Sequence, residues 1–147
     1  MRGLEQYLGF WLRRLSDTVA HRLEQKLAEH GVTVSQWDVL ISVYRGDATT
    51  ASEVSALMNI DPGAVSRLVD RLEAKGLISR KPDPSSRRSF VLALTDAGRT
   101  LVPQLSLTVD RHDQYFFGHL DEEERARLKE WMTGLLEHSH RMPDSLD

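Results

Sequence analysis

The sequence predicts a mainly helical fold that carries one small β-hairpin and has long helices at both ends. Apolar residues recur at the spacing of a helix face along most of the 147 residues. Between residues 78 and 94 the pattern changes to the alternation that is typical of a short strand. Capping residues and glycines mark the boundaries between these segments. Together, these observations favour a compact helical lobe with longer helical arms.

Two helices are expected before residue 47. Apolar residues from Leu4 to Leu27 form one stripe, which predicts a first helix of about 26 residues and about 40 Å at 1.5 Å per residue. The His-Gly pair at 30–31 ends it. The pair Ser35 and Asp38 resembles a capping box and predicts the start of the second helix, which Gly46 closes.

The next two helices are short and lie close together in the sequence. Thr50 with Glu53 repeats the capping pattern and predicts a third helix that runs to about residue 59. Asp61 can cap a fourth helix, with Pro62 at the first helical position, where a missing N–H group costs nothing. The glycine at 76 ends this helix.

A hairpin and two further helices complete the chain. Residues 78–81 are expected to pair with residues 90–94 across the turn sequence PDPSS. Thr95 then caps a long helix that reaches about Phe116. Asp121 with Glu124 predicts the start of the last helix.

The fourth helix has two contrasting faces. Its apolar residues, at positions 65, 68, 69 and 72, follow the spacing of one buried stripe. The opposite face carries small residues and hydrogen-bond donors. A helix with such an outward face fits the DNA major groove, which is wide enough to admit it. The outward residues are Gly63, Arg67, Asp70 and Ala74, flanked by Ser66 and Arg71.

Charge is unevenly distributed along the chain. The net charge is −3, but residues 62–88 hold seven basic and three acidic side chains, so this window carries +4 and the remainder −7. A basic stripe on an acidic body can bind a polyanion locally. Arg87 and Arg88 stand where a hairpin would touch phosphates or the minor groove. Chance segregation of surface charge and a solvated hairpin are the alternative interpretations.

Composition excludes several classes of protein. The chain has no cysteine, which removes disulfides, thiolate catalysis, thiol redox sensing and cysteine-ligated zinc. Neither a signal peptide nor a run of roughly 20 apolar residues is present, so we expect no membrane association and a cytoplasmic protein.

The segment that includes SRLVDRLEAKGLISR and DPSSRRSFVLALTDAGR resembles the MarR family of winged helix-turn-helix repressors in order and spacing. The specific resemblance covers about residues 35–100. It implies a homodimer that binds double-stranded operator DNA, with the fourth helix in the major groove and the hairpin, or wing, reaching the minor groove. It also implies a DNA-binding lobe at 35–99 between dimerisation helices at 1–34 and 100–147. One departure is Ser86, which replaces an acidic residue that often orients the wing arginines in the family.

The helix pattern and the resemblance together define a candidate DNA-binding set. Gly63, Ser66 and Arg67 match the groove-facing part of the family's recognition helix, and Arg88 matches its wing arginine. The full set is Pro62, Gly63, Ala64, Ser66, Arg67, Asp70, Arg71, Arg87 and Arg88.

A small-molecule effector is also expected, because family members commonly release DNA when an often aromatic and anionic molecule binds. We expect Trp11, Arg14, Trp37 and Tyr44 to lie near such a site, with the arginine as counter-charge. Aromatic residues at helical spacing are also typical of a core, which is the alternative for each of them.

Other functions are weighed against this interpretation. His112 with Asp110 and Asp113 could contribute to a zinc site, which would make the protein a metal-responsive regulator of the same fold, but no local ligand signature supports a metal or a cofactor. The common motifs of hydrolases, P-loop enzymes and metalloproteases are missing, so we expect no catalytic site. A winged helix that binds another protein is a further alternative.

Overall fold

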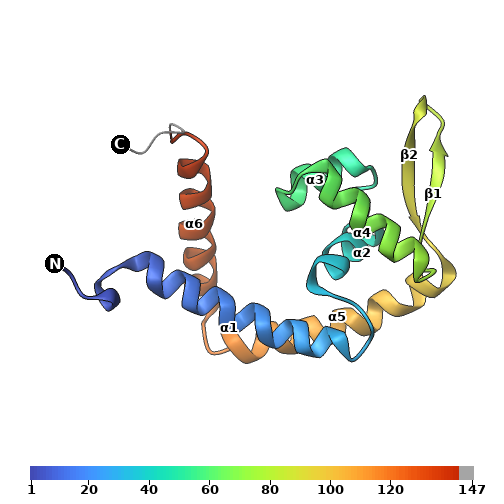
Figure 1. The fold of residues 1–147 in the computed structure, drawn as a ribbon. Helices are drawn as coiled ribbons and strands as arrows, with labels where there is room; N and C mark the ends of the chain where they lie inside the picture. The colour runs from blue at the N-terminus through green and yellow to red at the C-terminus, as the bar shows by residue number, and fades with distance from the viewer. Residues whose placement is uncertain (143–147) are drawn as a thin grey trace. The chain divides into compact units, whose positions relative to one another are not determined.

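The computed structural model describes residues 1–142, except for the side chain of Arg87. Its contacts divide the chain into two compact units, residues 1–110 and residues from 111 onward, and the long helix α5 spans the boundary. In chain order the elements are a 3-10 helix η1 (Leu4–Gln6), α1 (Leu8–Ala28), α2 (Val34–Arg45), α3 (Ala51–Met58), α4 (Pro62–Ala74), β1 (Ile78–Asp83), β2 (Ser86–Leu94), α5 (Asp96–Phe117) and α6 (Glu122–Ser139) (Figure 1).

Four of the expected helix starts are confirmed by side-chain caps. The side chain of Thr50 accepts a hydrogen bond from the Glu53 amide at the start of α3, and Asp61 accepts one from Ala64 at the start of α4. At α5, the Gly98 amide donates to the Thr95 hydroxyl at 3.1 Å. Asp121 caps α6 in the same way. Each cap satisfies an amide that has no partner inside its own helix.

Two predicted boundaries were wrong. The apolar stripe from residue 4 is not one helix, because Tyr7 has an extended backbone (φ −100°, ψ 122°) between η1 and α1. The second helix begins at Val34 rather than after Ser35. Its cap is Thr33, whose hydroxyl accepts from the Gln36 amide while the Gln36 side chain accepts from the Thr33 amide. Thr33 offers a complete capping box two residues earlier, so it competes successfully with Ser35.

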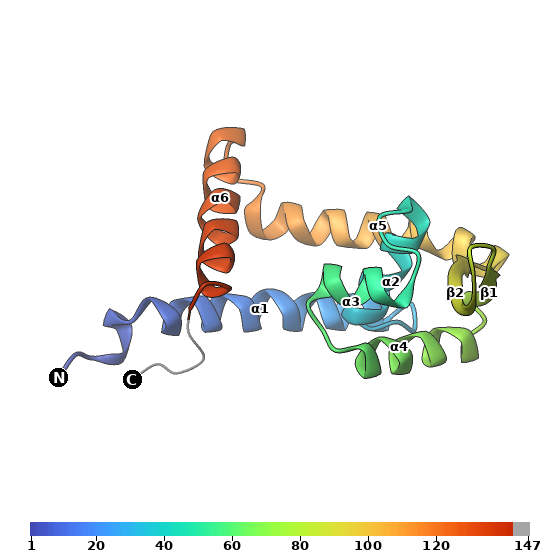
Figure 2. The ribbon, with the colours of Figure 1, turned by 90° about the horizontal axis from the view of Figure 1, so that it is seen from above.

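The core of the first unit lies among α2, α3, α4 and the base of the hairpin. These elements gather beside the C-terminal half of α1, while its N-terminal half extends away from them (Figures 1 and 2). Residues from every one of these elements are buried together, among them Leu27, Leu40, Val54, Leu72 and Ile78. Burial of this apolar surface fixes the lobe that carries α4.

The hairpin is antiparallel and irregular near its tip. Residues 78–82 pair in regular register with residues 94–90, after which Asp83 pairs with Ser86. Residues 87–89 of β2 therefore have no counterpart on β1 and form a bulge. Such bulges bend a strand and change the direction of its side chains. Here the bulge contains both predicted wing arginines.

The second unit contains the end of α5 and all of α6. Arg125 donates to the Asp113 carboxylate at 2.6 Å and to the Phe117 carbonyl at 3.1 Å, which ties the start of α6 to the end of α5. One side of α6 carries large apolar residues that are exposed in the single chain: Trp131, Met132, Leu135 and Leu136. Among the described residues, no helix combines the length and the apolar character that crossing a membrane requires.

Candidate DNA-binding interface

Helix α4 has one buried and one exposed face, as its sequence predicts. Val65, Val69 and Leu72 are buried in the core. The opposite face is open to solvent at Gly63, Ser66, Arg67, Asp70 and Arg71, and Pro62 is also exposed, while Ala64 is half-buried. At 13 residues the helix is about 20 Å long. It can therefore present its first two turns to the edges of base pairs.

The start of α4 is shaped for close approach by a long side chain. A β-carbon at Gly63 would lie 3.0 Å from the Asp61 carboxylate that caps the helix, and 3.5 Å from a guanidinium nitrogen of Arg67. The missing side chain at Gly63 leaves this space to Arg67 and to the cap. The outward helix face therefore has an arginine beside a stretch of bare backbone.

Asp70 differs from the other outward residues because it is already paired. Arg80 on β1 donates to the Asp70 carboxylate at 2.7 Å and to the Glu73 carboxylate at 2.8 Å. The hydrogen bond to Asp70, with the charges of both acids, raises the pKa of the Arg80 guanidinium. This fork fastens the base of the hairpin to the recognition helix. The single positive charge of Arg80 also offsets part of the negative charge of the two carboxylates, which would otherwise repel DNA phosphates more strongly.

Arg80 was not predicted from the sequence. The available signal is that Asp70 and Glu73 lie three residues apart, on one face of a helix, and precede a strand that carries an arginine. Which basic residue of the strand meets them depends on how the hairpin folds back.

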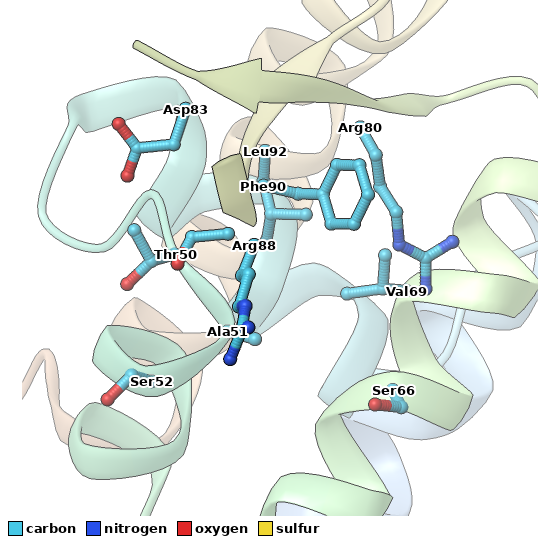
Figure 3. Close-up of a pocket in the computed structure, with 11 residues that line it drawn as sticks. Thr50, Ala51, Ser52, Ser66, Val69, Arg80, Asp83, Arg88, Phe90 and Leu92 are labelled. Atoms are coloured by element: carbon cyan, nitrogen blue, oxygen red, sulfur yellow. The ribbon is translucent and has the colours of Figure 1, made fainter. Parts of the chain in front are cut away.

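A groove of about 400 Å³ separates the hairpin from α3 and α4 (Figure 3). Arg88 extends from β2 into this groove past Ala51 at the start of α3, and Arg80 points to α4 beside Val69. The first amides of a helix carry partial positive charge. A guanidinium beside them can hold a backbone phosphate.

Where the resemblance implies an acidic residue in the wing, the chain has the hydroxyl group of Ser86. Ser86 Oγ accepts from the Arg88 amide and from the Ser89 hydroxyl, both at 3.4 Å, which are long hydrogen bonds. At the tip, the Ser85 hydroxyl and amide donate to Asp83 and lower the pKa of its carboxyl. Arg87 is a predicted site residue whose side chain lies outside the described part of the structure.

The hairpin is joined to the lobe by backbone hydrogen bonds as well. The Leu92 amide donates to the Thr49 carbonyl at 2.7 Å, just before α3. Directly after the end of β2, Thr95 donates through its hydroxyl to the Gly76 carbonyl and through its amide to the Leu77 carbonyl. The wing and the recognition helix are therefore held as one piece.

The four expected effector residues occupy different environments. The Arg14 guanidinium lies 5.8 Å from the centre of the Trp11 ring, and the Trp11 indole donates to the Glu5 carbonyl. Trp37 is only 7% exposed and belongs to the core, whereas Tyr44, at the end of α2, is 46% exposed. Along α1, Trp11 lies about 24 Å from Leu27, which shares the core with Trp37. The structure therefore brings Trp11 and Arg14 together but not all four.

The histidines do not gather into a ligand set. Within the described chain, no group of three or more His, Cys, Asp or Glu side chains is placed to hold a metal ion. His112 is buried and packs against the Phe116 ring, with ring centres 4.9 Å apart. Asp113, the expected neighbour in a zinc site, is paired with Arg125.

A helix pair with a capped recognition helix, followed by a hairpin that leans on it, defines a winged helix-turn-helix protein. Comparison with known proteins agrees. The MarR family model matches residues 30–89. An uncharacterized HTH-type transcriptional regulator from Bacillus cereus is 30% identical over 138 residues, covering 89% of each chain.

Solved structures show the same architecture. CouR from Rhodococcus jostii RHA1, bound to p-coumaroyl-CoA, has a TM-score of 0.83 at 27% identity, and the match covers 92% of this chain and 95% of that one. MepR from S. aureus, in complex with DNA, has a TM-score of 0.82 at 27% identity over 90% and 98% of the two chains. The chain belongs to the MarR family and is a winged-helix transcriptional regulator.

Proposed function

We propose that this protein is a repressor that binds a pseudo-palindromic operator as a homodimer and is released by a small anionic aromatic molecule. The observation that carries the DNA-binding part is the exposed face of α4, which presents Arg67 beside bare backbone while the hairpin is fixed to the same helix. The complex of the similar MepR with DNA supports this role. A repressor acts where the chromosome lies, so the proposal also implies a cytoplasmic protein; its role is DNA binding rather than catalysis.

We assign different contacts to the helix and the wing. Arg67 is the residue we expect to meet a base edge, because it stands on the first two turns of α4. Arg88, in the groove beside the α3 N-terminus, is expected to meet a phosphate. Asp70 contributes through its pair with Arg80 rather than through direct contact with DNA.

Dimerisation is supported by apolar surface that a single chain leaves exposed. In the first unit, the N-terminal half of α1 exposes Leu8, Trp11, Leu12 and Leu15. In the second unit, all four residues on the apolar side of α6 are exposed, and the largest of them, Trp131, is 64% exposed. Clusters of this kind mark protein interfaces. We therefore keep residues 1–34 and 100–147 as the proposed dimerisation helices around a DNA-binding lobe at 35–99.

The DNA-binding proposal is tested by selecting operators from random duplexes with the wild-type protein. Arg67→Ala should lose about 1–3 kcal/mol of operator binding and relax the preference at one position in each half-site. Arg88→Ala should weaken binding to all DNA sequences by a similar factor. It should also reduce the slope of log affinity against log salt concentration by about one. Arg127→Ala, on the exposed side of α6, is the matched control. Unchanged operator affinity in both test variants would place the DNA surface elsewhere.

The effector proposal rests on the Trp11 and Arg14 pair, which joins an aromatic ring to a cation. Binding of p-coumaroyl-CoA, an aromatic acyl thioester with anionic phosphates, by the similar CouR supports this chemical class. A coupling of 1–3 kcal/mol, typical of such systems, would weaken DNA binding about 5- to 150-fold. Aromatic carboxylates and their CoA esters should release operator DNA, with zinc and peroxide tested in parallel. If only zinc releases operator DNA, and a His112 variant no longer responds to zinc, the choice of an anionic aromatic effector is overturned.

A further inference from the structure

The residue that follows the last turn of the recognition helix reaches across the lobe to a distant part of the chain. Lys75 is the C-cap of α4. Its ammonium group donates to the Gly31 carbonyl at 2.5 Å and to the Gln36 side-chain oxygen at 2.8 Å. These partners lie 44 and 39 residues earlier in the sequence, where α1 ends and α2 begins.

Both acceptors are held firmly. Gln36 is 3% exposed, and its side-chain oxygen also accepts from the Thr33 amide in the capping box of α2. Gly31 has a left-handed backbone (φ 75°), and its amide donates to Ala28 at the end of α1. A cation is also favourable beside the carbonyl groups at the end of a helix. The lysine therefore joins α4 to a fixed point rather than to a mobile loop.

Lys75 itself is fixed at the backbone. Its amide donates to the Arg71 carbonyl at 3.0 Å, and the next residue, Gly76, takes the left-handed conformation that ends the helix. Side-chain packing of the apolar face of α4 sets the angle of the helix only within a scatter of about 15–20°. A hydrogen bond at one end of the helix narrows this range, because it is directional.

A small tilt at this end has a large effect at the other. Gly63 lies 12 residues from Lys75, or about 18 Å along the helix. A tilt of about 5° around Lys75 would move Gly63 by about 1.5 Å, which exceeds the tolerance of a hydrogen bond to a base edge. A contact that fixes the angle of α4 therefore also fixes the position of the residues that read the bases.

We propose that Lys75 is a positioning residue for DNA recognition, which locks the angle of the recognition helix to the junction of α1 and α2 through Gly31 and Gln36. The inference rests on the proposed role of α4 in DNA binding. Lys75 acts through other residues and does not itself contact DNA. A displacement of the end of α1 would pass through this contact to the base-reading face.

The test uses Lys75→Met, which removes the charge and donors but keeps a long side chain, with Lys75→Arg as the conservative variant. Lys26→Met on α1, whose side chain is 54% exposed, is the matched control. Affinity is measured for the operator selected by wild-type protein and for a scrambled duplex of equal length, at several salt concentrations. Lys75→Met should bind the operator at least 10-fold more weakly and the scrambled duplex within 2-fold of wild type, with an unchanged salt slope. Lys75→Arg should recover most of the loss.

Four results would overturn the inference. If Lys75→Met loses the same factor of affinity for the operator and for the scrambled duplex, and its salt slope falls by about one, Lys75 is a phosphate contact. A lower melting temperature with unchanged operator affinity would leave it only a structural role. If Lys75→Met keeps the preference for the operator over the scrambled duplex, the inference about Lys75 is refuted and the proposed function stands. If the wild-type protein itself shows no sequence preference, the proposed function is refuted, and the inference with it.

A second variant tests the same contact from its other side. Gln36→Glu keeps an oxygen that accepts from both Thr33 and Lys75, so operator preference should persist when Lys75 is present. Combined with Lys75→Met, the new carboxylate loses its cation, and amide exchange should accelerate in residues 31–36 and in α4 of the free protein. Independent effects of the two substitutions on operator preference would contradict the proposed contact.

Discussion

Substitution of Arg80 should separate the wing from the recognition helix. Its guanidinium donates to Asp70 and Glu73, and its side chain is 28% exposed, while the two carboxylate side chains are 65% and 43% exposed. Exposed ion pairs contribute about 0.2–1 kcal/mol each. Because the arginine is the more buried partner and forms both hydrogen bonds, we expect a total loss of about 1–2 kcal/mol in the free energy of unfolding for Arg80→Met.

A double-mutant cycle isolates the contact between Arg80 and Asp70. Urea unfolding of wild type, Arg80→Met, Asp70→Asn and the double variant, at one protein concentration, should give a coupling energy of about 0.5–1 kcal/mol. Operator affinity should also fall in Arg80→Met, because the hairpin loses its tie to α4. Lys81→Met is the control, since the next residue of the strand points to the opposite face. A coupling energy indistinguishable from zero would refute the view that this pair holds the wing.

Three further predictions concern packing, protonation and assembly. Gly98→Ala should destabilise the protein by more than about 1 kcal/mol in urea unfolding, because a β-carbon there would overlap the Leu77 carbonyl oxygen; unchanged stability would show that α5 shifts without cost. Burial, and secondarily the charge of Glu24, raise the pKa of Asp38 from 3.8 to about 6, so stability should increase as pH falls from about 6 toward 4 and decrease as pH rises through 6. Asp38→Asn should therefore add about 1–3 kcal/mol to the free energy of unfolding at pH 8 and little at pH 4, and an equal gain at both values would exclude the carboxylate as the cause. Trp131→Glu should shift a dimer toward monomer in sedimentation at low micromolar concentration, and a wild-type protein already monomeric there would contradict the proposed interface.

Much of the secondary structure could be predicted from residues that are close together in the sequence. The caps at Thr50, Asp61 and Asp121 act within three residues of themselves, so the sequence nearby contains both partners of each hydrogen bond. The two faces of α4 follow from its period for the same reason. The start of the second helix was misplaced because Thr33 and Ser35 offer competing caps, and the break at Tyr7 interrupts an apolar stripe that is otherwise continuous.

The sequence by itself determined the starts of the last four helices, the hairpin and the face of α4 that is offered to DNA, because these depend on neighbours within one or two turns. Only the tertiary structure decided that Arg80 pairs with Asp70, that Lys75 reaches Gly31, and that Trp37 belongs to the core. The partners of Lys75 lie about 40 residues away, and no local period encodes which distant acceptor a flexible cation will meet. Folding of the core selects those partners, because it brings the ends of α1 and α4 within hydrogen-bond distance.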